Sequence, residues 1–507
     1  MAAASAVLLL LLVLLSASAI STVFCRREME LLGMAQTHVL EARTWAESHP
    51  QGGGGIASPM LSSRAALLPA AGVALRDCAK LYEESEQRLN QLALLKEGDQ
   101  EDGYEREDDA VTWVSGVMSN HRTCLDGLEE KGYDVGTQGL HKNLTLLLGE
   151  TLHLFAKNKH KAKAKAKPKS KSTTKGKHIE VIRGLLASWN PTESKAHFAV
   201  AQDGSGSHTT IGAAIEAVSS MGHNRPERVI IHVKSGVYNE KVEIGYKLKN
   251  LMLVGDGIGK TIITGARSVR HGSSTVGSAT FDVSGDGFWG RDMTIENRAG
   301  PQDHQAVAMK VSSDLSVFYR CSFRGYQDTL YVHSNRQFYR DSIISGTVDF
   351  IFGDASVVFQ NCDILLQQPA SHQSIFITAQ GRDDPNQPTG IVIQNCKVRP
   401  ASGSAGAKNY LGRPWKKYSR TVFMKNDLDG CIDPKGWSEW DGGFALSTLY
   451  YAEYMNNGAG ASTQNRVKWP GFHVLLSTSE VMPFSVNEFL GGGRWIPATG
   501  VPFSAGV

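Results

Sequence analysis

The chain has 507 residues, of which 41% are hydrophobic and 20% charged, with a formal net charge of +3. That length is ample for two or more domains with a large hydrophobic core. Ten lysines and no acid fall within residues 157–177, so +3 less ten leaves −7 for the rest of the chain, and overall charge gives no support for nucleic-acid binding.

The first predicted element is a short apolar run near the N-terminus. Residues 7–15 are nine consecutive apolar residues, and Ser16-Ala17-Ser18-Ala19 follow them. The run is too short to span a bilayer, and the small residues are typical of a signal-peptide cleavage site. Residues 1–19 are therefore predicted to be a secretory signal peptide that directs the chain to an oxidising compartment. No stable membrane insertion is expected, because no later segment is long and apolar enough.

Residues 28–156 show apolar residues with the period of an α-helix. Three stripes follow i, i+3, i+4 and i+7 spacing, and they include Leu75, Cys78, Tyr82, Leu89 and Leu92; Val114, Val117, Met118, Leu125 and Leu128; and Leu144, Leu147, Leu148, Leu152 and Phe155. Such stripes form the core of a helical bundle. The pattern therefore predicts an all-α domain over this part of the chain.

Residues 157–177 form a low-complexity run in which lysine alternates with small residues. Self-repulsion and the lack of apolar side chains predict an extended, solvated linker. The alternative is an electrostatic tether to a polyanion, because ten positive charges in one short run attract such a partner.

From about residue 195 the pattern changes to short runs rich in β-branched residues, separated by Gly and Asn. A polar pair followed by an apolar β-former recurs every ~20–35 residues, which is typical of a solenoid. Clear copies begin at Arg291, Arg340, Gln360 and Gln394, with a looser copy around Arg320. No helical patterns alternate with these runs, so a doubly wound sheet is not favoured. The pattern predicts a parallel β-helix.

Two aspartates stand in matching aromatic or apolar runs where strands rarely carry Asp. Asp328 lies in Y-Q-D-T-L-Y, and Asp349 follows 21 residues later in T-V-D-F-I-F-G. Since one coil of a β-helix takes about 20 residues, the two side chains should stack one strand spacing (~4.8 Å) apart. Two carboxylates at that separation cannot both ionise freely, which divides them into an acid and a base or nucleophile.

Five motifs, in order, carry a resemblance to plant pectin methylesterases (pectinesterases): G-V-Y-N-E at Gly236–Glu240, Q-A-V-A at Gln305–Ala308, G-Y-Q-D-T-L-Y at Gly325–Tyr331, D-F-I-F-G at Asp349–Gly353 and L-G-R-P-W at Leu411–Trp415. The resemblance implies a right-handed parallel β-helix catalytic domain over residues 195–507. Residues 28–156 resemble the inhibitor domain that precedes such enzymes in plant precursors, which is a four-helix bundle.

The same resemblance assigns catalytic roles. It implies that Asp349 attacks the ester carbonyl of a methylated galacturonate, while Asp328 protonates the departing methanol and then activates water. Arg413 would keep Asp349 ionised through a bidentate contact. Gln305 and Gln327 would donate hydrogen bonds to the oxyanion.

Aromatic residues beside these motifs are candidates for binding the sugar chain. Trp415, two residues past Arg413, is expected to stack against a sugar ring. Tyr326 and Phe350 flank the two aspartates and are expected to do the same. Gln305 and Arg413 are also assigned to substrate binding.

The implied activity is hydrolysis of methyl esters in pectin, in the cell wall, without a metal or an organic cofactor. The sequence contains no G-x-S-x-G and no zinc-ligand spacing. Two alternatives remain: a β-helical pectin lyase or glycosidase, and an inactive wall-binding or inhibitory protein. Expected partners are methylesterified pectin, pectin methylesterase inhibitor proteins and a processing protease, and the processed enzyme is expected to be a monomer.

The resemblance also implies covalent modifications. Cys78 and Cys124 match a disulfide of the inhibitor domain, whereas Cys25 is the only cysteine upstream of them. Arg183-Gly184-Leu185-Leu186 is similar to the processing site between inhibitor and enzyme, so residues 157–186 are predicted to hold the linker and the cleavage site.

Other residues are candidates on their own pattern. Asn143-Leu144-Thr145 is a glycosylation sequon. Cys362 and Cys396 occupy equivalent positions of two repeats, so they are expected either to form a disulfide or to remain free thiols in the core.

Overall fold

The computed structural model describes residues 26–48, 67–97, 103–133, 139–165, 184–401 and 406–507. The chain divides into two compact units, residues 1–168 and 169–507. They are called here the helical unit and the β-helix unit. The predicted signal peptide, Cys25 and Arg183 lie outside the described residues.

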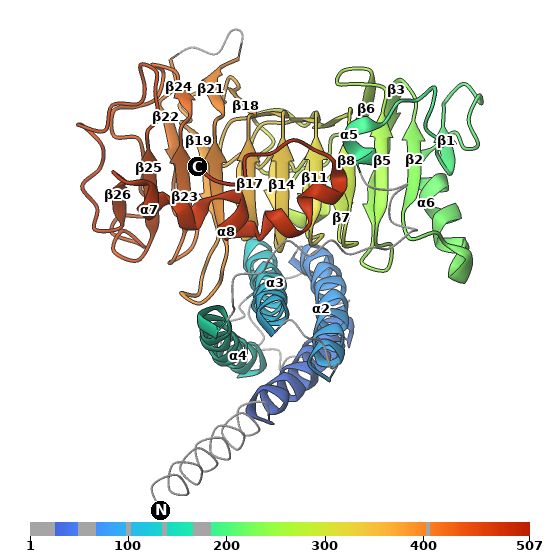
Figure 1. Cartoon of the computed structure of the whole chain (residues 1–507), viewed down its shortest axis with the longest axis horizontal. Coiled ribbons are helices and arrows are strands. Elements are labelled where there is room, and N and C mark those ends of the chain that lie inside the picture. Colours follow the sequence, from blue (N-terminus) through green and yellow to red (C-terminus); the bar gives the residue numbers. More distant parts are fainter. Residues whose placement is uncertain (1–25, 49–66, 98–102, 134–138, 166–183, 402–405) are drawn as a thin grey trace, which may run out of the picture. The chain divides into compact units, whose positions relative to one another are not determined.

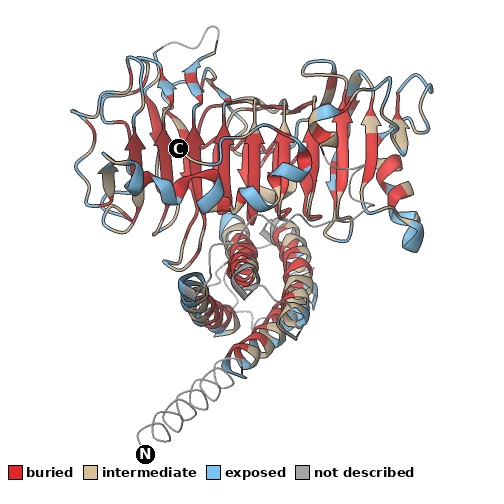
Figure 2. Ribbon diagram, viewed as in Figure 1, coloured by how far each residue is buried: buried red, intermediate tan, exposed pale blue. Residues whose placement is uncertain are grey.

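The described residues of the helical unit form four long helices: residues 26–48, α2 (Leu67–Glu97), α3 (Gly103–Glu130) and α4 (Gly139–Lys165) (Figure 1). The apolar stripes face inward (Figure 2), and Leu89, Val114 and Leu148 are completely buried. The predicted four-helix bundle is confirmed. None of the described helices is long and apolar enough to cross a membrane.

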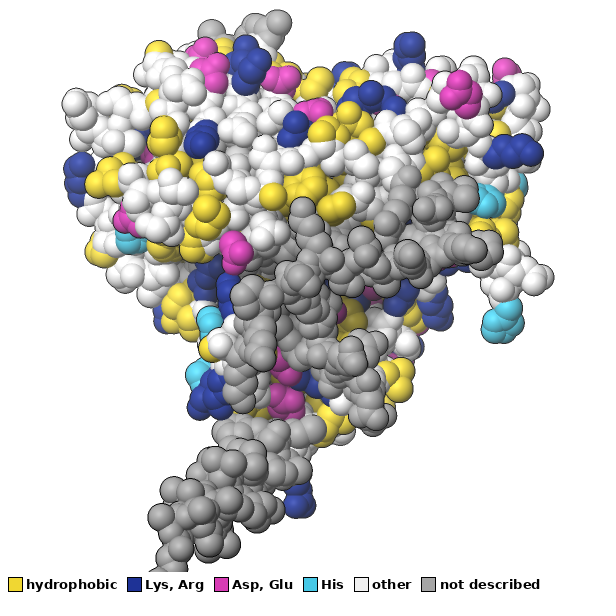
Figure 3. Space-filling view, viewed as in Figure 1, with side chains coloured by type: hydrophobic (Ala, Val, Ile, Leu, Met, Phe, Trp, Pro, Cys, Tyr) yellow, Lys and Arg dark blue, Asp and Glu magenta, His cyan; other side chains and the backbone are white. Residues whose placement is uncertain are grey.

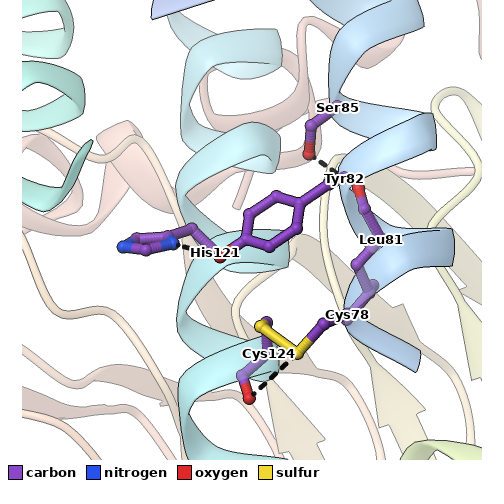
Figure 4. The surroundings of a disulfide bond; sticks show 6 residues. All are labelled: Cys78, Leu81, Tyr82, Ser85, His121 and Cys124. Carbon is purple, nitrogen blue, oxygen red and sulfur yellow. Dashed lines mark hydrogen bonds between the residues drawn. A yellow bond between two sulfur atoms is a disulfide. The ribbon is translucent and has the colours of Figure 1, made fainter. Parts of the chain in front are cut away.

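One disulfide joins α2 to α3 inside this bundle (Figure 4). Cys78 and Cys124 lie 46 residues apart in sequence, and their Cα atoms are 4.7 Å apart. Closing a loop of that length restricts the unfolded chain and stabilises the folded unit by about 3–4 kcal/mol. Asn143, the candidate glycosylation site, is exposed on α4.

The prediction of an extended linker from residue 157 was wrong for its first part, because α4 continues to Lys165. Alanine and lysine are both good helix formers, and lysines near a helix C-terminus interact favourably with the helix dipole. Lys159 also pairs with Asp108 of α3 at 2.5 Å, which joins this end of α4 to the bundle. Residues 166–177 lie outside the described residues.

The β-helix unit is built from three parallel sheets, and successive coils contribute one strand to each. Sheet A consists of β1 (Phe198–Val200), β2 (Val229–Val233), β5 (Leu251–Gly255), β8 (Trp289–Arg291), β11 (Ser316–Tyr319), β14 (Arg336–Arg340), β17 (Ser356–Gln360), β20 (Gly390–Gln394), β23 (Arg420–Met424), β25 (Tyr450–Tyr454) and β26 (Phe472–Val474). Sheet B consists of β3 (Gly236–Asn239), β6 (Thr261–Gly265), β9 (Thr294–Asn297), β12 (Ser322–Arg324), β15 (Ile343–Gly346), β18 (Asp363–Leu366), β21 (Lys397–Pro400) and β24 (Asp427–Leu428). Sheet C consists of β4 (Val242–Ile244), β7 (Phe281–Val283), β10 (Met309–Val311), β13 (Leu330–Val332), β16 (Ile351–Gly353), β19 (Ile375–Gln380) and β22 (Asn409–Gly412). The predicted right-handed parallel β-helix is confirmed.

The repeated polar pair is the corner between sheets A and B. Its second residue has a positive φ in copy after copy, including Asp292 (55°), Asp341 (48°), Asn361 (57°) and Asn395 (53°). Asn and Asp tolerate this left-handed conformation better than most residues. The repeat in the sequence is thus the repeated bend that turns each coil from one sheet to the next.

Inside the coils, equivalent side chains stack on one another. The rings of Phe318, Tyr339 and Phe359 lie on adjacent strands of sheet A with centroids 4.8 and 4.6 Å apart. The strands of all three sheets are largely buried (Figure 2). Cys362 and Cys396 are free thiols in this interior, and the Cys362 N–H donates to Cys396 Sγ at 3.3 Å. The structure thus takes the second of the two predicted alternatives for this pair.

Short helices surround the strands: α5 (Leu185–Ser188), α6 (Ile211–Ser220), α7 (Thr478–Val481), α8 (Val486–Leu490) and the 3-10 helices η2 (Gly222–Asn224), η3 (Val276–Ser278), η4 (Met482–Phe484), η5 (Gly492–Arg494) and η6 (Ile496–Thr499). Leu186 of α5 is completely buried in a second core outside sheet A. Arg291 Nη1 donates to the carbonyls of Leu186 (2.5 Å) and Ala187 (2.9 Å). Cleavage after Leu186, as predicted from the resemblance, would therefore require this segment to leave sheet A.

Candidate active site

The two aspartates occupy equivalent positions on neighbouring coils, at the turns that lead into β13 and β16. Leu330 pairs with Ile351, and the Asp328 N–H donates to the Val348 carbonyl at 3.0 Å. Continuing that register back by two residues places Asp328 opposite Asp349, one strand spacing (~4.8 Å) away along the axis. Both have a positive φ, 62° and 53°, and both are buried.

Asp349 is held by a bidentate ion pair. Arg413 donates from Nε to Oδ1 at 2.8 Å and from Nη2 to Oδ2 at 2.6 Å. Burial raises the pKa of Asp349 above its ordinary value, and the hydrogen bonds and charge of Arg413 oppose that rise. Burial also acts to lower the pKa of Arg413, but contact with Asp349 and the nearby charge of Asp328 raise it overall. The guanidinium stays charged and fixes both carboxylate oxygens in one plane.

Two glutamine side chains beside the aspartates are available to a ligand. Gln305 and Gln327 are half-buried, and neither amide side chain is hydrogen-bonded within the described part of the chain. The Ala306 N–H donates to the Gln327 carbonyl at 3.2 Å, so the two amides belong to adjacent coils. Amide N–H groups free of protein partners can donate to a developing oxyanion.

Aromatic rings form a platform on the outer face of sheet C. Tyr331 and Phe352 are stacked at 4.2 Å, and the half-buried ring of Trp415 lies edge-on to both, at 6.4 and 5.9 Å. Tyr331 and Phe352 belong to the two coils that carry the aspartates, and Trp415, which follows β22, packs against both rings. Tyr326 is half-buried next to Gln327.

The prediction that Phe350 contacts the sugar was wrong. Its side chain is completely buried in the interior of the β-helix. It fills the corner before β16, where a Cβ built on Gly346 would lie 2.2 Å from Phe350 Cβ. The turn at Asp349 directs Phe350 inward and Phe352 outward, so the aromatic residue that stacks on Tyr331 is two positions further along the chain.

Two further aromatic residues of the site were not identified from the sequence. The ring centroids of Phe376 and Trp440 lie 4.2 and 4.4 Å from Arg413 Cζ. Trp440 also lines a cleft of about 570 Å³, together with Tyr410, Trp437 and Trp469. Trp440 thus contacts Arg413 and also forms part of the wall of this cleft.

The described residues hold no group of three or more His, Cys, Asp or Glu side chains arranged to bind a metal ion. On the face shown in Figure 3, basic and acidic side chains of the β-helix unit are interspersed. The chemical groups gathered at the site are therefore two carboxyl groups, one guanidinium, two amides and several aromatic rings.

Comparison with known proteins gives consistent matches for both units. Residues 197–493 match the family model described as pectinesterase, and residues 55–154 match the model described as plant invertase/pectin methylesterase inhibitor. The chain is 51% identical to the Arabidopsis thaliana protein described as probable pectinesterase/pectinesterase inhibitor 36, over 97% of each chain.

Two solved structures extend the comparison. Pectin methylesterase from carrot is 50% identical, with a TM-score of 0.60, and the match covers 62% of this chain and 98% of that one. A pectin methylesterase mutant in complex with a hexasaccharide is 30% identical, with a TM-score of 0.50, and the match covers 59% of this chain and 98% of the other.

Proposed function

This chain belongs to the pectinesterase family, and from that premise we propose that it demethylates pectin with Asp349 as nucleophile and Asp328 as acid and base. The observation that carries the proposal is the bidentate ion pair between Arg413 and Asp349. Asp349 lies one coil away from Asp328. Arg413 opposes the burial that raises the pKa of Asp349, and so favours the ionised and oriented carboxylate that a nucleophile requires. A second carboxyl group at one strand spacing is close enough to exchange protons with the same ester.

The reaction then proceeds in two steps. Asp349 attacks the C6 carbonyl carbon of a methylated galacturonate, and the Gln305 and Gln327 amides donate to the oxyanion. The C–O bond to the methoxy group breaks, Asp328 gives its proton to that oxygen, and methanol leaves behind an anhydride with Asp349. Asp328 next takes a proton from water, and the hydroxide attacks the same carbon. The acid product departs and Asp349 is regenerated.

The substrate and location are part of the proposal. A hexasaccharide occupies a related pectin methylesterase, and a polymeric pectin chain presents the same kind of repeating sugar unit to the aromatic platform. Trp415 and Tyr326 are proposed to contact it. The predicted signal peptide over residues 1–19 supports secretion to the plant cell wall, and the resemblance of the helical unit to inhibitors supports contact with pectinesterases.

The test measures methanol released from methylated pectin by the secreted chain and its variants. Asp349→Asn is expected to lose activity by about 10³-fold or more, and Asp328→Asn by a similar factor. Asp341→Asn is the matched control, because it is an aspartate with positive φ at a structural corner, outside the site, and it should retain activity. Wild-type methanol release by Asp349→Asn would contradict the proposal.

The same assay separates the alternatives. New reducing ends or unsaturated ends without methanol would indicate cleavage of the sugar chain itself. No product of any kind, from the full chain or from a chain that begins at Ala187, would indicate an inactive wall-binding or inhibitory protein.

A further inference from the structure

Arg413 contacts two aromatic rings that lie outside the sequence motifs of the site. Its Cζ lies 4.2 Å from the ring centroid of Phe376 and 4.4 Å from that of Trp440. Only 22% of the Arg413 side chain is exposed. A planar cation packed against two π faces resists rotation out of its plane.

Phe376 is the more constrained of the two rings. It lies on β19 between Ile375 and Ile377, which point into the core, so its own side chain points outward. Its ring stacks on Tyr410 of β22, with centroids 5.6 Å apart and an angle of 12° between the planes. Phe376 and Tyr410 are also paired residues of the neighbouring strands β19 and β22, so the backbone ladder holds the two rings in register.

The backbone of Phe376 forms hydrogen bonds with residues on both sides of Asp349 in the sequence. Its N–H donates to the Thr347 carbonyl at 3.2 Å, and its carbonyl accepts from the Phe350 N–H at 3.3 Å. One residue therefore contacts the segment that carries the carboxylate through its backbone and the partner arginine through its ring. Because a side-chain substitution leaves both backbone bonds in place, the contribution of the ring can be measured separately.

Trp440 covers Arg413 from a loop. The Ser438 N–H of that loop donates at 3.0 Å to the carbonyl of Gly412, the residue before Arg413. Trp440 remains 37% exposed and lines the cleft, while its ring also contacts the guanidinium.

We propose that Phe376 is a positioning residue, which together with Trp440 fixes the Arg413 guanidinium in the plane that binds both oxygens of Asp349. The inference rests on the proposed function, since it concerns the orientation of the nucleophile. Without the Phe376 ring the guanidinium turns more freely, and the two hydrogen bonds to Asp349 are less often made together. Fewer Asp349 carboxylates are then ionised and aligned at a given pH.

The test compares Phe376→Leu with Phe376→Tyr in the full chain. Leucine keeps an apolar side chain but removes the π face, and tyrosine restores it. Phe376→Leu is expected to lower kcat by about ten-fold with little change in KM, and Phe376→Tyr to recover most of the loss. The acid limb of the kcat/KM profile should move to higher pH in the leucine variant alone. A loss of packing alone would lower the active fraction without moving that limb.

Other titratable or charged groups near Asp349 could also shift the acid limb of the kcat/KM profile. They are Arg413, Asp328 and the buried Tyr451, and none of them is altered in these variants. An unchanged acid limb and unchanged kcat in Phe376→Leu would overturn the inference, even when Asp349→Asn abolishes turnover. Full activity in Asp349→Asn would instead overturn the proposed function. The two failures are therefore distinguishable.

Discussion

The helical unit and the β-helix unit stabilise their interiors by different means. The helical unit is closed by one disulfide, and its core includes two buried histidines, His121 and His141. The described part of the β-helix unit has only free cysteines, and the side chains of its Arg466–Glu453 ion pair are 1% and 2% exposed, whereas those of the Lys96–Glu28 pair in the helical unit are 5% and 8% exposed. The difference follows from architecture, because stacked strands hold a β-helix together through backbone ladders along its whole length.

This contrast has consequences that can be measured. A buried ion pair is insensitive to pH near neutrality, but removal of one partner leaves an uncompensated charge. A cross-linked bundle depends on its redox state. Buried neutral histidines make a unit sensitive to mild acid. Each substitution or condition below therefore acts on one unit more than on the other.

The largest expected effect on stability comes from Glu453→Ala in the β-helix unit. Glu453 accepts from Arg466 and from Trp437 Nε1, and both charged side chains are almost fully buried. Leaving Arg466 unpaired is expected to cost about 3–5 kcal/mol, measured from the urea unfolding midpoint. Glu243→Ala is the control, since its pair with Lys241 is partly exposed and is worth less than about 1 kcal/mol. Equal losses in both variants would contradict the argument.

A reductant is expected to destabilise only the helical unit. Breaking the Cys78–Cys124 disulfide should lower the free energy of unfolding of that unit by about 3 kcal/mol, and Cys78→Ala with Cys124→Ala should reproduce the loss. The unfolding transition of the β-helix unit should not move. A shift of that second transition would show that Cys362 and Cys396 are oxidised in the secreted protein, contrary to the structure.

Arg413→Lys tests the ion pair between Arg413 and the proposed nucleophile, Asp349. An ammonium group cannot bind both oxygens of Asp349 in one plane, so kcat for methanol release should fall by about 10²-fold, or about 2.7 kcal/mol. Arg320→Lys is the matched control, because Arg320 makes a similar two-bond contact with Asp292 at a corner away from the site. Comparable losses in the two variants would indicate a general effect on the fold.

The sequence predicted the features that depend on local periodicity. The stripes containing Leu148 and Leu89 are core, and the polar pairs are corners because Asn and Asp accept a positive φ. The spacing of Asp328 and Asp349 equals the offset between β13 and β16, so the motif alone placed them on adjacent coils.

Features that depend on tertiary context were missed. Phe350 turned inward because the corner at Asp349 interrupts the alternation of the strand. Phe376 and Trp440 meet Arg413 only after coils of unequal length are stacked, and nothing local to either residue indicates that contact. The lysine run was predicted to be extended because of its charge. Its first part is helical instead, owing to helix propensity and the Lys159–Asp108 pair.

The smallest predicted effect is a loss of stability of the helical unit in mild acid. Burial lowers the pKa of His121 to about 3, and burial also lowers the pKa of His141. Well above pH 6.5 both histidines are neutral in the folded and unfolded states, and their effect on stability is absent. As the pH falls below 6.5, the unfolded state binds protons that the folded state excludes, so stability decreases until the folded-state pKa is reached. At pH 5 His121 alone should cost about 2 kcal/mol.

The β-helix unit provides the internal control for this effect. It also buries a histidine with a lowered pKa, His333, and desolvation lowers the pKa of His197 and His473, so its stability should fall in mild acid as well. His121→Gln removes one titrating group from the helical unit, and the pH dependence of its unfolding midpoint between pH 7.5 and 5 should become shallower. The slope for the β-helix unit should not change. An unaltered slope in the helical unit of His121→Gln would mean that its acid sensitivity resides in other groups, and the contrast between the two interiors would then lose its histidine component.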